Sequence, residues 1–305
     1  MLPVLFKAFT LIFIMALGYL LKRLRFFSPS SYTVVSKIVM NITLPAAIIT
    51  GFASFVFQSS IIGVVFLGFL CNVLLLIMGY FVARKRDNRT KAYCMLNFPG
   101  YNIGAFTMPF VQSFLGPFGI VITSMFDAGN SIMCTGGSYA ITSSVVGAKQ
   151  RSRVFDSVKK LLSSVPFDTY MIMLALSLFR IHMPSSVFVL SSTVGNANAF
   201  LAMLMIGMMF EMTAKPEYIR QVLLTLSIRY AFAISFALLF YFFMPYSLAV
   251  RRVLVIVVFA PLSILTPIFT EKSDGDPALS SLTGSLSILI SIAIITMLLV
   301  TMHIG

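Results

Sequence analysis

The feature that most constrains this chain is a succession of long apolar segments separated by short polar connections. Cutting the sequence at charged and turn-forming residues gives ten segments, each long enough to cross the hydrocarbon core of a bilayer as a helix. They span residues 3–21, 31–54, 60–83, 91–115, 117–147, 164–181, 186–212, 217–243, 247–271 and 278–303. None shows the period-two alternation of a barrel strand, so we expect an all-α polytopic membrane protein.

The composition excludes a cytosolic globular enzyme. Hydrophobic residues make up 59% of the 305 residues and charged residues only 10%. Soluble domains are about 45–50% apolar and about 25% charged. The chain also lacks the G-x-S-x-G, H-E-x-x-H and P-loop motifs, so we expect no enzymatic activity. Cys71, Cys94 and Cys134 lie in apolar segments without metal-ligand spacing, and we therefore expect neither a metal nor another cofactor.

The formal net charge of +13 comes from basic residues that are distributed as in a membrane protein, not as on a nucleic-acid-binding surface. Sixteen Lys and Arg residues lie in the connections from odd to even segments, and three lie in the alternate connections. The sixteen are Lys22, Arg23, Arg25, Arg84, Lys85, Arg86, Arg89, Lys91, Lys149, Arg151, Arg153, Lys159, Lys160, Lys215, Arg220 and Lys272; the three are Arg180, Arg251 and Arg252. The positive-inside rule then places the odd-to-even connections in the cytoplasm and both termini outside the cell membrane. We expect no nucleic-acid partner, because no soluble basic module is present.

The longest polar stretch, 149–164, divides the ten segments into five and five. Halves with an odd number of spans cross in opposite directions, so two related halves would form an inverted-topology repeat. We therefore expect a first five-helix repeat at 1–147, a cytoplasmic linker at 148–163 and a second five-helix repeat at 164–305. Polar and small residues cluster in the second and seventh segments, and paired prolines occur in the fourth and ninth.

The paired prolines predict that the fourth and ninth segments are interrupted helices. Pro99 and Pro109 lie in the fourth segment, and Pro261 and Pro267 lie in the ninth. Each proline removes a backbone donor, and unwound backbone within a membrane is tolerated where it lines a polar cavity or binds a ligand. The N-terminus of a half-helix there suits a carboxylate. A pair of proline-kinked helices without a site is the alternative.

Two ionisable residues lie deep within apolar segments. Asp127 shares a helix face with Asn130, and we expect this pair to serve proton coupling, cation ligation or gating, or to form a structural hydrogen-bond hub. Arg229 lies near the middle of the eighth segment. It is a candidate partner for an anionic substrate, although pairing with Asp127 or reaching towards the interface remain alternatives.

The sequence resembles the auxin efflux carrier family of membrane permeases in its short bacterial form. Residues 35–46 are similar to the family's second helix with its Asn-x-x-x-Pro core, and residues 126–130 resemble the Tyr-Asp-x-x-Asn start of its fifth helix. Residues 102–109 resemble the Asn-x-Gly-x-x-Gly-x-Pro crossover, with Thr107 in place of the second glycine. Residues 261–276 resemble the ninth helix and its acidic turn.

The resemblance implies ten transmembrane helices in a five-plus-five inverted repeat, with broken helices 4 and 9 crossing at the substrate site. This architecture is shared with bile-acid/sodium symporters. It further implies a homodimeric scaffold of helices 1, 2, 6 and 7 in the lipid bilayer, and a transport domain of helices 3–5 and 8–10 that moves as an elevator. Family substrates are organic anions such as auxin, malate or malonate.

We therefore predict a secondary active transporter of a small organic anion, a mono- or dicarboxylate, with a proton or sodium as candidate coupling ion. The predicted substrate-binding residues are Asn41, Asn102, Gly104, Thr107, Pro109, Ser263, Thr266 and Pro267. Asp127, Asn130 and Arg229 are the predicted coupling or polar-support residues. The alternatives are a sodium- or proton-coupled symporter of the bile-acid type, a sodium/proton antiporter, and a membrane receptor that binds a ligand without moving it.

Overall fold

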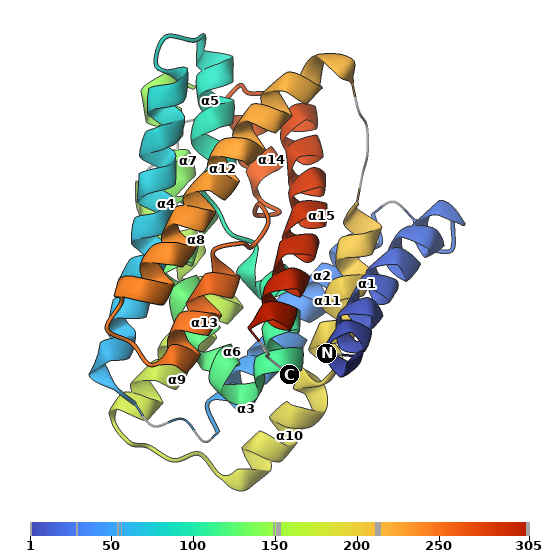
Figure 1. Ribbon diagram of the computed structural model, residues 1–305, viewed down its shortest axis with the longest axis vertical. Coiled ribbons are helices and arrows are strands. Elements are labelled where there is room, and N and C mark those ends of the chain that lie inside the picture. Colours follow the sequence, from blue (N-terminus) through green and yellow to red (C-terminus); the bar gives the residue numbers. More distant parts are fainter. Residues whose placement is uncertain are drawn as a thin grey trace.

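The computed structural model describes residues 2–28, 30–53, 55, 57–148, 150, 154–210 and 215–302. Over this part of the chain helix follows helix, as Figure 1 shows. Seven helices among the described residues are long and apolar enough to cross a membrane, and a bent pair brings the number to eight. The all-α polytopic class is therefore confirmed. Of the basic residues in the connections, Lys149, Arg151 and Arg153 lie outside the described residues.

Several of the predicted segments are divided into shorter helices. The first half contains α1 (Leu2–Arg23), α2 (Tyr32–Ile38), η1 (Val39–Thr43), α3 (Leu44–Gly51), η2 (Ser59–Ile61), α4 (Ile62–Ala83), α5 (Asn88–Asn97), η3 (Ile103–Thr107), α6 (Met108–Ile132), η4 (Met133–Gly137) and α7 (Ser138–Val146). The second half contains α8 (Val154–Leu161), α9 (Val165–Leu178), α10 (Ser185–Gly195), α11 (Ala197–Met209), α12 (Pro216–Phe243), α13 (Leu248–Val257), α14 (Thr266–Lys272) and α15 (Pro277–Thr301).

The helical run from Ile103 to Val146 covers the second part of the predicted fourth segment and nearly all of the fifth. Gly116 interrupts it with φ 59° and ψ −155°, and Pro117 follows. A positive φ favours glycine, because a Cβ would be strained in that conformation. The run therefore turns at the position predicted as the boundary between the fourth and fifth segments. The helix in the predicted sixth segment is shorter than expected, since α9 has only 14 residues. It is bent by 71° from the end of α8.

The helices pack in two groups, each of which draws on both halves of the chain. The α1 group consists of α1, α2, α3, α9, α10 and α11. Within it α1 packs on α11, and α3 packs on α9 and α10. The α4 group consists of α4–α7 and α12–α15, in which α4 packs on α5 and α6, and α12 packs on α13 and α15. Helix α6 also contacts α3, α9 and α11, so it forms the main contact between the groups (Figure 1).

The two polar and small-residue clusters noted in the sequence meet inside the α1 group. Thr43 donates a hydrogen bond through Oγ1 to Oδ1 of Asn198 at 3.1 Å, and both side chains are buried. Gly195 lies against the backbone of Ala47, where a Cβ would come within 2.8 Å of the Ala47 nitrogen. Small residues at such a crossing let helix backbones approach closely in a membrane.

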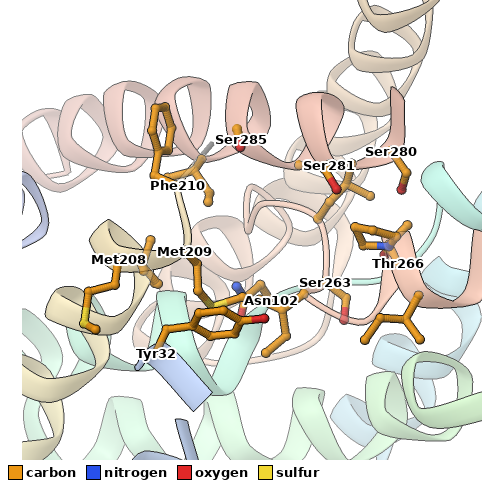
Figure 2. Close-up of a pocket in the computed structure, with 17 residues that line it drawn as sticks. Tyr32, Asn102, Met208, Met209, Phe210, Ser263, Thr266, Ser280, Ser281 and Ser285 are labelled. Carbon is orange, nitrogen blue, oxygen red and sulfur yellow. The ribbon is translucent and has the colours of Figure 1, made fainter. Parts of the chain in front are cut away.

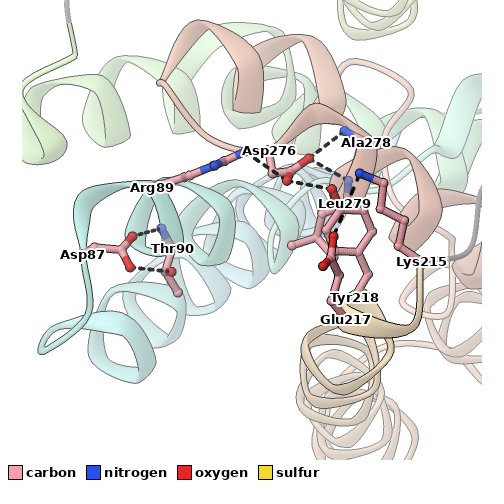
Figure 3. Close-up of polar contacts among 9 residues, drawn as sticks. All are labelled: Asp87, Arg89, Thr90, Lys215, Glu217, Tyr218, Asp276, Ala278 and Leu279. Atoms are coloured by element: carbon pink, nitrogen blue, oxygen red, sulfur yellow. Dashed lines mark hydrogen bonds and ion pairs between the residues drawn. The ribbon is translucent and has the colours of Figure 1, made fainter.

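One end of the α4 group is held together by Asp276, the N-cap of α15 (Figure 3). Its carboxylate accepts hydrogen bonds from the N–H groups of Ala278 and Leu279 at 3.1 Å, from Tyr218 Oη on α12 at 2.9 Å and from Arg89 on α5 at 3.0 Å. Burial opposes ionisation of Asp276, but these four donors outweigh it and hold the pKa of the carboxyl below its ordinary value. The ends of three helices therefore converge on one ionised side chain.

Candidate functional site

The site begins with two interruptions in otherwise helical segments. Helix α5 ends at Asn97 and the next helical turn begins at Ile103, while α13 ends at Val257 and α14 begins at Thr266. Gly100 lies in the first interruption with φ 86°, a conformation that side chains with a Cβ rarely adopt. The breaks predicted from the prolines are thus present in both segments.

The two interruptions cross each other in the protein interior. Tyr101 and Leu262 form an isolated antiparallel bridge, and the backbone N–H of Asn102 donates to the carbonyl of Pro261 at 2.9 Å. The N–H of Leu262 donates to Ser287 Oγ on α15 at 3.0 Å. The two extended segments therefore satisfy part of each other's backbone, as non-helical backbone at membrane depth requires. We refer to residues 98–102 and 258–265 as the crossover.

Two asparagines satisfy a further part of the backbone of the first interruption. Asn72 on α4 accepts a hydrogen bond from the N–H of Gly100 at 2.7 Å. Asn130 on α6 accepts from the N–H of Tyr101 at 3.1 Å and donates to the carbonyl of Tyr101 at 2.9 Å. The two amides are themselves joined, because Asn72 Nδ2 donates to Asn130 Oδ1 at 3.1 Å. Sequence reasoning missed Asn72, whose signal is its place as the one amide in the apolar helix α4.

Asp127 extends this amide network towards the α1 group. Its Oδ1 accepts a hydrogen bond from Asn130 Nδ2 at 2.8 Å, as expected for two residues on one helix face. Its Oδ2 accepts a hydrogen bond from Tyr170 Oη on α9 at 2.7 Å. All three side chains are buried. Asp127 therefore connects the crossover to a helix of the other packing group, and Tyr170 is a second partner that the sequence did not indicate.

Arg229 on α12 binds the crossover itself and is not paired with Asp127. The buried guanidinium donates to the carbonyl oxygens of Phe98 and Gly100 in the first interruption, the latter at 2.8 Å. It also donates to the carbonyls of Ala260 and Pro261 in the second interruption, at 3.1 and 3.4 Å. Its Cζ lies 4.8 Å from the centroid of the Tyr101 ring. The predicted alternatives of pairing with Asp127 and of reaching to the interface are both wrong.

A cavity of about 220 Å³ adjoins the crossover, between α2, α11, α14 and α15 (Figure 2). Four predicted site residues line it, namely Asn102, Ser263, Thr266 and Pro267. The other lining residues are Tyr32, Ile206, Met208, Met209, Phe210, Leu262, Ile264, Ile268, Ser280, Ser281, Gly284, Ser285 and Ile288. The cavity wall is therefore largely apolar, with a few hydroxyl and amide groups, which is typical of sites for small organic ligands.

Asn102 provides the most informative polar atom of this cavity. Its side chain is 6% exposed, and its Nδ2 has no hydrogen-bond partner among the described residues. A buried amide donor without a partner costs free energy of about 1–3 kcal/mol. Asn102 also occupies the N-cap position of the helical run that begins at Ile103, and its side chain makes no capping hydrogen bond. The first backbone N–H groups of a helix have no intrahelical acceptor. A free donor and a helix N-terminus thus occur together at the cavity.

The other predicted substrate-binding residues of this segment, Gly104, Thr107 and Pro109, follow the first interruption and do not line the cavity. A Cβ at Gly104 would lie 2.8 Å from Leu44 Cδ2, so this glycine faces α3. Thr107 donates through Oγ1 to the carbonyl of Asn102 at 3.4 Å, and Pro109 lies in the first turn of α6.

Asn41, which we predicted at the substrate site, does not line the cavity. Its side chain is exposed, and Nδ2 donates to the carbonyl of Lys37 at 2.9 Å within its own helix. The neighbouring Thr43 is the buried polar residue of this helix. Asn41 is therefore not among the residues that line the cavity, although η1 packs against η3.

The fold and the cavity define the class of this protein. A polytopic helical protein with two interrupted segments crossing beside a cavity has the features expected of a membrane transporter. A family model for membrane transport proteins of the auxin efflux carrier type matches residues 3–157, which is just over half of the chain. The chain belongs to this family. No curated protein matches the chain.

Proposed function

We propose that this protein is a secondary active transporter of a small organic anion, a mono- or dicarboxylate, which binds in the cavity beside the crossover. The observation that carries the proposal is the buried, unpartnered Nδ2 of Asn102 at that cavity. A carboxylate oxygen accepts a hydrogen bond from an amide, and a helix N-terminus favours negative charge. Asn102 offers both features at one point.

The remainder of the cavity fits an organic rather than an inorganic anion. Met208, Met209 and Phe210 supply apolar surface on one side, while Ser280 and Ser281 supply hydroxyls on the other (Figure 2). An inorganic oxyanion would require polar partners on every side, whereas a carboxylate with a hydrocarbon body requires them at one end.

The two packing groups support an elevator-type mechanism. In our proposal the ten predicted segments form a five-plus-five inverted repeat, with the α1 group as scaffold and the α4 group as the moving transport domain. The scaffold would form a homodimer in the cell membrane, with both termini outside. Tyr32, Phe210 and Ser280 lie near helix ends that adjoin basic connections. In our proposal the cavity therefore opens towards the cytoplasm, because the positive-inside rule favours that side for these connections.

Uptake by purified protein in proteoliposomes tests the proposed function. Labelled malate, malonate, succinate, lactate and indole-3-acetate would be supplied under an imposed potential, pH gradient or sodium gradient. We expect saturable uptake of at least one of them. We expect Asn102→Ala to lower it about tenfold or more, since a hydrogen bond to a charged group contributes about 1.5–3 kcal/mol.

Asn41→Ala is the matched control, because it removes the same side chain from an exposed position outside the cavity. It should retain wild-type uptake. Equal uptake by Asn102→Ala and the wild type would refute the site. If no carboxylate moves under any gradient, yet one of them raises the unfolding temperature of the wild type, the protein is a receptor rather than a carrier.

A further inference from the structure

We propose that Arg229 is a built-in cation that occupies the position where a sodium or potassium ion would otherwise bind the crossover. Transport by this chain then uses no inorganic cation at that position. The part of this inference that concerns transport rests on the proposed function, whereas the part that concerns the cation site does not.

The carbonyl oxygens around Arg229 lie in the two interruptions, just beyond the C-terminal ends of two helices. Phe98 and Gly100 follow the end of α5, and Ala260 and Pro261 follow the end of α13. The last carbonyls of a helix lack intrahelical donors and carry the negative end of the helix dipole. Two such ends converge on one point in the protein interior, so this point favours a positive charge.

The same set of ligands suits an inorganic cation. Unwound backbone carbonyls and half-helix C-termini coordinate sodium in transporters, and rings of backbone carbonyls replace the hydration shell of potassium in channels. In this protein the guanidinium reaches all four oxygens from both interruptions. Arginine suits this role, because its planar group presents five N–H donors and stays protonated.

No carboxylate competes for Arg229 among the described residues that surround it. Asp127, the one acidic residue buried nearby in the network, accepts its hydrogen bonds from Asn130 and Tyr170. The positive charge of Arg229 is therefore balanced by carbonyl dipoles and by the face of the Tyr101 ring. A buried arginine is costly in a membrane unless such partners are present. Its position is best explained by the need of the crossover for a cation.

Thermal unfolding of the purified protein in detergent tests the cation site without any substrate. Wild type, Arg229→Gln and Arg229→Lys would be compared in sodium, potassium and choline chloride at equal ionic strength. Glutamine keeps donors but loses the charge, whereas lysine keeps the charge. For the wild type, and likewise for Arg229→Lys, we expect the unfolding temperature to be the same in sodium, potassium and choline chloride. We expect Arg229→Gln to be less stable in choline and to be stabilised saturably by sodium or potassium.

Arg251→Ala is the control for a general loss of arginine hydrogen bonds. Arg251 also binds backbone carbonyls, those of Tyr246 at 2.6 Å and Tyr241 at 3.0 Å, but it lies outside the crossover. We expect a lower unfolding temperature for this variant, with no difference between the three salts. A cation response of Arg251→Ala equal to that of Arg229→Gln would overturn the proposal.

Three further results would also overturn it. They are saturable stabilisation of the wild type by sodium or potassium, an Arg229→Gln variant that no cation stabilises, and loss of folded Arg229→Gln in all three salts. Recovery of this variant in sodium or potassium but not in choline would support the proposal. Failure of every carboxylate to move would refute the proposed function and leave the unfolding results, and with them the cation-site inference, intact.

Discussion

At the scale of single residues, the hydrogen bond between Tyr170 and Asp127 joins the two packing groups. Tyr170→Phe removes the donor and leaves Oδ2 of Asp127 buried without it, which costs about 1–3 kcal/mol. We therefore expect a lower unfolding temperature. A thiol-reactive dye measures it, because Cys71 and Cys94 are buried and become reactive only when the protein unfolds.

The control for this substitution is Tyr80→Phe, which removes the hydroxyl of a tyrosine that is 40% exposed. This hydroxyl has no hydrogen-bond partner among the described residues, so we expect almost no change in unfolding temperature. Equal shifts for Tyr170→Phe and Tyr80→Phe would show that the bond to Asp127 contributes nothing to stability.

The residues of this network illustrate which contacts can be predicted from sequence. Asp127 and Asn130 are three residues apart, so helix geometry alone predicts their contact, and the structure confirms it. Tyr170 is 43 residues from Asp127, and Asn72 is 58 residues from Asn130. A single polar residue in an apolar helix shows that a partner is needed but not which helix supplies it, because that depends on tertiary packing.

At the scale of helices, Asp276 fixes the start of α15 through its ionised carboxylate. Because the pKa of Asp276 is below its ordinary value in the folded protein, the ionised form stabilises the fold at neutral pH. This contribution is present above the pKa of the unfolded chain, about 3.9, and is lost as the pH falls through the lower pKa of the folded state. Acidification therefore weakens the junction between α5, α12 and α15.

We expect Asp276→Asn to flatten this part of the pH dependence. Asparagine is about as good an N-cap as aspartate, so most of the capping of α15 remains while the titrating group is lost. The unfolding temperature of the wild type should therefore fall more steeply than that of the variant between about pH 5 and pH 3. Parallel curves for the two proteins would contradict the assignment.

Arg89→Gln separates the cap from the ion pair at the same junction. The Arg89 side chain is 65% exposed, and exposed ion pairs contribute about 0–1 kcal/mol. We therefore expect this variant to keep the acid dependence of the wild type. The acid dependence is then determined mainly by the hydrogen bonds that Asp276 accepts from the backbone and from Tyr218.

At the scale of the whole molecule, local chemistry predicts the interruptions but not the grouping of helices. The prolines of the fourth and ninth segments remove backbone donors, and both breaks are present where expected. The division into two packing groups follows from which helix faces are complementary in shape, and each group combines helices distant in the sequence. Hydrophobic periodicity carries little of this information in a membrane, since lipid-facing and buried positions are both apolar.

Relative movement of the two groups is the part of our proposal that cross-linking tests. Asn198 on α11 contacts one side chain from each group. Its Nδ2 lies 3.4 Å from Oε1 of Gln112, on α6 of the α4 group. Its Oδ1 lies 3.1 Å from Oγ1 of Thr43, on the side of the α1 group. In a variant without the three native cysteines, Asn198→Cys is combined with Gln112→Cys or with Thr43→Cys, and each pair is bridged by a short bis-thiol reagent. If the α4 group moves against the α1 group, the bridge to position 112 arrests uptake and a reductant restores it, whereas the bridge to position 43 leaves uptake unchanged. Uptake that continues with position 112 fully bridged would rule out sliding at this interface, because α6 would then be fixed to α11 throughout transport.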